Sequence, residues 1–103
     1  MYVKTGDRIK FAEERQSYKV CAADERYAVC IKPFNARKTT LYTIIDFERG
    51  ERGPDDRIFS RRYETDDDAA RALGELQSGD IAVSHRRSVK TNIEKVIPRK
   101  ERV

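Results

Sequence analysis

The segment LYTIIDF, residues 41–47, carries the strongest strand pattern in the chain. Alternate side chains of a strand point to opposite faces of a sheet, so this segment divides into two sets. One set is Leu41, Thr43, Ile45 and Phe47, and the other is Tyr42, Ile44 and Asp46. Both sets are mainly apolar, so we expect both faces of this strand to be at least partly covered.

Shorter strand patterns precede this segment. Residues 8–11 alternate polar and apolar side chains after a Gly-Asp turn signal, which predicts a strand with Ile9 and Phe11 facing inward. Two more alternating runs within residues 18–32 flank the polar residues 24–26. This arrangement predicts a β-hairpin.

The only two cysteines, Cys21 and Cys30, fall on the two arms of that hairpin. If Glu25 and Arg26 form a two-residue turn, the cysteines would lie directly opposite each other on paired strands. No apolar leader precedes them, so we expect a reducing, cytoplasmic setting and no membrane association. Disulfides are rare there, which favours two reduced, partly buried thiols.

The second half of the chain predicts one helix among strands. Residues 48–56 hold two glycines and a proline and predict a turn-rich loop, followed by a short strand at 57–60. Residues 66–77 predict a helix, with Thr65 and three aspartates at its start, Gly79 at its end, and a stripe formed by Ala69, Leu73 and Leu76. Strands are expected at residues 81–85 and 89–97.

At 103 residues and 12.0 kDa the chain is long enough for one core. We therefore expect a single α+β domain over residues 1–97. Its architecture would be a small, mainly antiparallel sheet or open barrel of about five to six strands, packed by one α-helix. Residues 98–103 are expected to form a flexible basic tail.

The net charge of +4 is unevenly distributed. Residues 86–103 contain seven basic and two acidic residues, and the remaining chain holds 15 basic and 16 acidic residues. A nucleic-acid module commonly carries a basic face across its fold, so the sequence pI of 9.2 is only weak support for one.

Catalytic and metal-binding patterns are absent from the sequence. His85 is the only histidine, and the neighbouring Ser84 would point to the opposite face of a strand. The carboxylates at residues 66–68 fan out around a helix and fit capping better than a metal site. Asp46 could be a buried carboxyl that does acid–base work or a satisfied structural carboxylate, and we favour the second. We therefore expect a non-enzymatic protein without metal or cofactor.

Arginines around the middle turn are the first candidates for anion binding. The planar guanidinium group binds carboxylate and phosphate through two parallel hydrogen bonds, which singles out Arg52, Arg57, Arg61 and Arg62. If Arg52 and Arg57 only hold a ligand, replacing both with alanine should leave the fold intact. Ion pairing of the same arginines with the aspartates at residues 55–56 is the alternative.

A second candidate surface combines basic and aromatic residues. Lys38 lies in a loop with Phe34, and Tyr42 follows on the next strand. Aromatic side chains can stack on a base while basic groups contact its phosphates. An ordinary sheet edge with solvated lysines has the same composition.

Four motifs together resemble a family of small phage and prophage proteins of unassigned function. They are GDRIKFAEERQSYKV at residues 6–20, KPFN at 32–35, YTIIDF at 42–47 and RGPD at 52–55. The resemblance spans residues 3–93. It implies a virus-encoded accessory protein acting in a bacterial cytoplasm, where such proteins often block host defence.

Three functions remain open at this point. The first is sequestration of a nucleotide-like anionic signal, in a site formed between subunits of a homo-oligomer, because one small sheet offers little concavity. The second is inhibition of a host defence protein by covering its surface. The third is nucleic-acid binding through the sheet and the basic C-terminal residues.

Overall fold

The computed structural model describes residues 3–31, 42–57 and 65–99. The elements are β1 (Arg8–Phe11), β2 (Tyr18–Ala23), β3 (Tyr27–Ile31), β4 (Tyr42–Asp46), β5 (Glu51–Gly53), α1 (Asp66–Ser78), β6 (Val89–Lys90) and β7 (Ile93–Ile97). The strands form one sheet in the order β6-β5-β4-β3-β2-β1-β7, and all neighbours are antiparallel. The predicted α+β fold with a small antiparallel sheet and one helix is confirmed.

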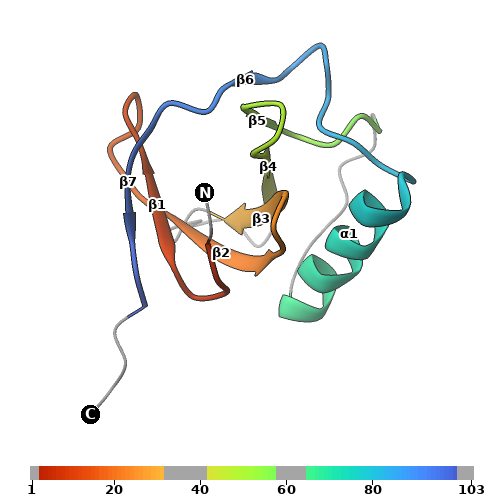
Figure 1. The fold of residues 1–103 in the computed structure, drawn as a ribbon, viewed down its shortest axis with the longest axis horizontal. Coiled ribbons are helices and arrows are strands. Elements are labelled where there is room, and N and C mark those ends of the chain that lie inside the picture. Colours follow the sequence, from red (N-terminus) through yellow and green to blue (C-terminus); the bar gives the residue numbers. More distant parts are fainter. Residues whose placement is uncertain (1–2, 32–41, 58–64, 100–103) are drawn as a thin grey trace.

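The two outermost strands of this sheet are consecutive in the chain. Val89 of β6 pairs with Arg52 of β5, and Ile97 of β7 pairs with Arg8 of β1. One segment therefore reaches both edges of the sheet and curls it into a half-barrel, as Figure 1 shows along the top and left of the molecule.

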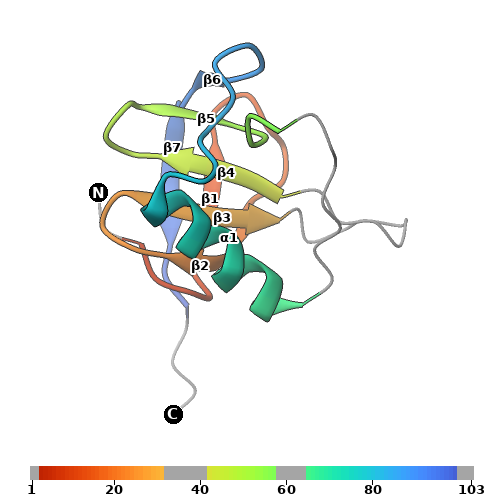
Figure 2. The ribbon, with the colours of Figure 1, turned by 90° about the vertical axis from the view of Figure 1, so that its right-hand side faces the viewer.

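Each face of the central strands packs against a different cluster. Inside the curl, Ile9, Phe11, Val20 and Ile45 are fully buried. On the outer face, side chains of β2, β3 and β4 pack beneath α1, which lies in front of the sheet in Figure 2. The covering expected on both faces of residues 41–47 is confirmed over β4, because Ile45 belongs to the inner cluster and Ile44 to the outer one.

Helix α1 follows the predicted pattern closely. Its buried residues are Ala69, Ala72 and Leu76, while Leu73 is partly buried against the same cluster. The Asp68 carboxylate accepts a hydrogen bond from the Thr65 backbone N–H at 3.1 Å, which satisfies one amide at the helix start. The helix ends at Gly79, whose φ of 82° is readily adopted by glycine.

The predicted hairpin forms, but the opposition of its two cysteines is wrong. Ala23 pairs with Ala28, and the Asp24 backbone N–H donates to the Tyr27 carbonyl oxygen at 2.9 Å around the turn at residues 25–26, yet the register shifts between Val20 and Ala22. This β-bulge at Cys21 brings Val20 opposite Cys30. Cys21 consequently lies in the outer cluster and Cys30 in the inner one, and both are buried free thiols.

Three sequence predictions in the second half need correction. The loop expected at residues 48–56 contains β5, and the strand expected at 81–85 is a single β-bridge between Val83 and Asp55. The last strand, expected at 89–97, breaks into β6 and β7 because its two ends pair with opposite edges. The strand expected at 57–60 lies almost entirely outside the described residues.

Beyond β7, the described chain stays attached to the sheet. The backbone N–H of Arg99 donates to Asp7 Oδ1 at 3.0 Å. The tail beyond Arg99 lies outside the described residues. Within the described ranges, no helix combines the length and apolar character needed to cross a membrane.

Gly53 supplies a test of how closely the last segment lies on β5. A Cβ at this position would lie 3.1 Å from Ser88 Cα and 3.2 Å from the Arg87 carbonyl oxygen, both backbone atoms. We expect Gly53→Ala to lower the free energy of unfolding by about 1–3 kcal/mol through overpacking, measured by urea denaturation.

Gly74, in α1, has open space around it and is the matched control. Gly74→Ala should stabilise the protein by about 0.5–1 kcal/mol, and equal effects of the two substitutions would contradict the close packing.

Candidate functional site

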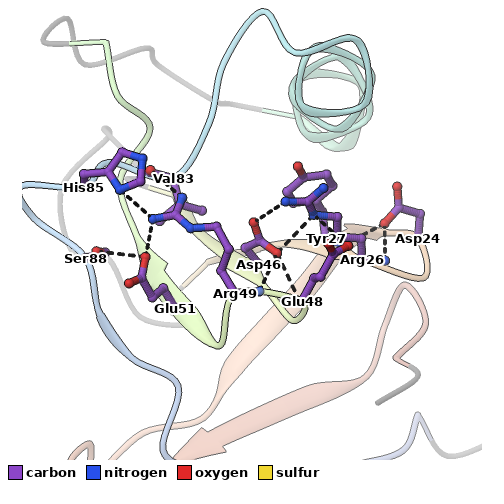
Figure 3. Close-up of polar contacts among 10 residues, drawn as sticks. All are labelled: Asp24, Arg26, Tyr27, Asp46, Glu48, Arg49, Glu51, Val83, His85 and Ser88. Carbon is purple, nitrogen blue, oxygen red and sulfur yellow. Dashed lines mark hydrogen bonds and ion pairs between the residues drawn. The ribbon is translucent and has the colours of Figure 1, made fainter.

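Two polar groups flank the turn between β4 and β5, as Figure 3 shows. The first is centred on Asp46, whose side chain is 3% exposed. Its carboxylate accepts bonds from Arg26 Nε at 3.2 Å and Nη2 at 3.1 Å, and from the backbone N–H groups of Glu48 and Arg49 at 3.1 Å each. Asp46 is thus a satisfied structural carboxylate that fixes the turn, as the sequence indicated.

The hydrogen bonds decide the ionisation of Asp46. Burial by itself favours the protonated acid, but the bonds from Arg26 and from the turn amides outweigh it and hold the pKa of Asp46 below its usual value. The nearby Asp24 accepts from the backbone N–H of Tyr27 at 2.6 Å and from Gln77 at 2.9 Å. It thereby joins the hairpin turn to the end of α1.

The second polar group is centred on Arg49. Its guanidinium donates to the Val83 carbonyl oxygen at 3.3 Å, pairs with Glu51, and lies 2.9 Å from His85 Nδ1. Glu51 also accepts from the Ser88 hydroxyl at 3.3 Å. In Figure 3, Arg49 lies between His85 and Glu51, so it fastens the segment containing His85 to the β4–β5 hairpin.

We call residues 85–99 the basic arm, because five cations, Arg86, Arg87, Lys90, Lys95 and Arg99, accompany one acidic residue. Arg86 and Arg87 lie in an exposed turn directly after His85. The single carboxylate, Glu94, pairs with Lys10 at 3.3 Å. Across the described ranges, no ion pair involves Arg86, Arg87, Lys90 or Lys95. These four cations therefore have no carboxylate partner in the part of the chain that the structure describes.

The opposite side of the molecule is acidic. Residues 65–80, comprising α1 and its flanks, carry five acidic residues and only one arginine. Strand β7 lies on the far side of the sheet from α1 in both ribbon views. The cations of β7 therefore lie across the sheet from the acidic helix.

Arg52, the first predicted anion-binding residue, points into the half-barrel and is only 7% exposed. Its guanidinium carbon lies 3.9 Å from the centre of the Phe11 ring, and Nη2 pairs with Glu13 at 2.7 Å and Glu14 at 3.7 Å. The hydrogen bond from Arg52 lowers the pKa of Glu13. Two carboxylates already surround this cation, which argues against a second anion there.

The structure separates the other predicted site residues. Arg57 is exposed, with Nη2 donating to the Asp80 carbonyl oxygen at 3.0 Å and its backbone N–H donating to Asp55 at 2.8 Å. Tyr42 is buried under α1 and donates to the Thr65 carbonyl oxygen at 3.2 Å. Burial raises the pKa of Tyr42. Arg52, Arg57 and Tyr42 thus contact different parts of the fold.

The predicted residues Phe34, Lys38 and Arg61 lie outside the described residues. Arg49 was missed by the sequence reasoning, since nothing in a Glu-Arg-Gly-Glu turn indicates a bond to a histidine 36 residues away. His85 lies in the turn that begins the basic arm instead of in the predicted strand. His85 is exposed and Ser84 is buried, and neither lies in a strand, so the strand geometry expected to separate them does not apply.

The described residues contain no group of three or more His, Cys, Asp or Glu that could hold a metal ion. No protein-family model, curated protein or solved structure matches the chain.

The lowered pKa of Asp46 implies that the free energy of unfolding decreases in acid. A carboxyl with a lowered pKa in the folded state contributes stability above its unfolded pKa and loses it as the pH falls through the folded value, so stability should fall below about pH 4. Asp46→Asn should cost about 2 kcal/mol at neutral pH and flatten this acid dependence, as measured by urea denaturation across pH. An unchanged pH profile in the variant would show that other groups govern acid unfolding.

Because Arg52 is buried, its removal should destabilise the fold, whereas the sequence analysis expected the fold to stay intact without it. Arg52→Ala removes a buried side chain packed on Phe11, so we expect a loss of about 2 kcal/mol in the free energy of unfolding. The exposed Arg57→Ala should change it by less than about 0.5 kcal/mol. Thermal denaturation of the two single variants measures both effects, and a fully stable Arg52→Ala protein would refute the packing role.

Proposed function

We propose that this protein is a non-enzymatic binding protein that holds a phosphate-bearing anion on its basic arm. The observation that carries the proposal is the exposed pair Arg86 and Arg87, which has no carboxylate partner among the described residues and is followed along the chain by the exposed cation Lys90. Adjacent guanidinium groups suit the several acceptor oxygens of phosphate.

The fold supports this choice of surface over the one expected from sequence. Backbone bonds hold the arm and the residue before it to the β4–β5 hairpin and the residue after it. Thr91 N–H donates to the Gly50 carbonyl at 3.0 Å, and Ser84 N–H donates to the Pro54 carbonyl at 2.9 Å. Side-chain bonds from Arg49 and Ser88 add to these. A backbone fixed in this way presents its cations at low cost in conformational entropy.

The phosphate has two sources that fit the proposal. One is a free nucleotide-like signal, as expected for an accessory protein that blocks host defence in a bacterial cytoplasm. The other is the backbone of a nucleic-acid strand. The cations extend along the arm from Arg86 to Lys95, so several could contact successive phosphates of a strand.

Arg86→Ala/Arg87→Ala tests the proposal. Fluorescence anisotropy with a labelled single-stranded oligothymidylate should show wild-type binding that weakens with salt, and the slope of log affinity against log salt should fall by about one for each arginine removed. Calorimetry with cyclic and linear nucleotides tests the free-nucleotide source in parallel. Binding to mononucleotides would support signal capture, and binding to the oligonucleotide alone would support a nucleic-acid partner.

Lys4→Ala/Lys19→Ala is the matched control, because it removes the same charge from exposed positions outside the arm. It should retain nearly the full salt slope. Equal loss in the two double variants would reduce the effect to net charge, and absence of wild-type binding to every phosphate probe would contradict the proposal.

A host-protein inhibitor is the second candidate, favoured by one observation on the same arm. Val89 is 52% exposed, the most exposed large apolar side chain in the described part of the chain, and it lies next to Lys90. An apolar residue among cations suits a protein surface that is acidic around an apolar centre. Binding through Val89 would persist at high salt, which distinguishes it from phosphate binding.

A further inference from the structure

We propose that His85 couples anion binding on the basic arm to proton uptake, so that the arm binds its anion more tightly in mildly acidic solution. This inference rests on the proposed function and concerns the regulation of the same surface. His85 is the only histidine of the chain and immediately precedes Arg86.

The contact between Arg49 and His85 determines which nitrogen of the neutral His85 ring carries the proton. Arg49 Nη2 lies 2.9 Å from His85 Nδ1. A guanidinium group has only donors and keeps its charge, so it must be the donor in this contact. Nδ1 must then offer a lone pair, which places the single proton of a neutral imidazole on Nε2.

Protonation removes this bond. An imidazolium ion carries N–H on both nitrogens and cannot accept from Arg49, so the contact changes from a hydrogen bond to a repulsion between two cations. Histidine is the side chain that ordinarily changes charge in the mildly acidic range. His85 is exposed, so the ring can turn away from Arg49 into solvent.

The charged groups around His85 favour an anion as the new partner. Arg49 and Glu51 face it from the β4–β5 hairpin, while Arg86, Arg87 and Lys90 belong to its own segment. Glu51 is the only carboxylate in this described set, and it already engages Arg49 and Ser88. An imidazolium released from Arg49 would stand beside two arginines that have no described ion pair, which completes a three-cation surface for phosphate.

The test combines wild-type protein with His85→Gln. Glutamine offers a carbonyl oxygen to Arg49 but does not take up a proton, so it mimics neutral histidine at every pH. With labelled oligothymidylate as the probe, we expect wild-type affinity to rise about threefold between about pH 7.5 and about pH 5.5 and that of His85→Gln to stay level. Calorimetry in two buffers of different ionisation enthalpy should show proton uptake on binding by the wild type only.

Nuclear magnetic resonance gives a readout that needs no ligand. With one histidine in the chain, its imidazole nitrogen signals are unambiguous, and those of the neutral ring should show the proton on Nε2. The Nδ1-protonated form would overturn the inference.

The remaining outcomes separate the two proposals. Wild-type binding with the same affinity at both pH values, or an equal rise in His85→Gln, would overturn the proton coupling and leave the phosphate-binding function standing. Absence of binding to the oligonucleotide and to the nucleotide panel at both pH values would overturn the proposed function and the coupling together.

Discussion

Burial of both faces of the central strands is the constraint on which the structure depends. Ile44 and Ile45 of β4 are neighbours with opposite directions, and each is at most 2% exposed. A strand of this kind requires one layer on each side. Helix α1 supplies the outer layer, and the curl of the sheet supplies the inner one. The course of the basic arm is tied to the same constraint, because its strands β6 and β7 form the two edges of the curled sheet.

Structural features that depend only on neighbouring residues could be predicted from local sequence patterns. The alternation in residues 41–47 predicted double-sided burial, and the aspartates before Ala69 with Gly79 after the apolar stripe predicted α1 closely. The general fold class followed from these elements. Such features could be read because strand alternation, helix periodicity and caps are set within a few residues.

Features that depend on distant pairing were not predictable in this way. The bulge at Cys21 changes which face of the sheet the residues after it occupy, and no glycine in this segment indicates a bulge. The division of residues 89–97 into two strands depends on both edges of the sheet, and its sequence alternation continues through the break. Arg52 was chosen for its chemistry, but its direction is set by pairing of β5 with β4, which turns it inward beside Ile45. The Arg49–His85 contact likewise exists only because the arm crosses the hairpin.

The pairing of β7 with β1 also bears on how the chain is made. Arg8 is synthesised 89 residues before its partner Ile97. Until then β1 presents an unpaired backbone edge, and the inner apolar cluster lacks the contributions of Ile93 and Val96. Unpaired edges of this kind invite contact with other nascent chains. The half-barrel therefore closes only after residues 93–97 have left the ribosome, and its open edge is exposed to aggregation and proteolysis during that interval.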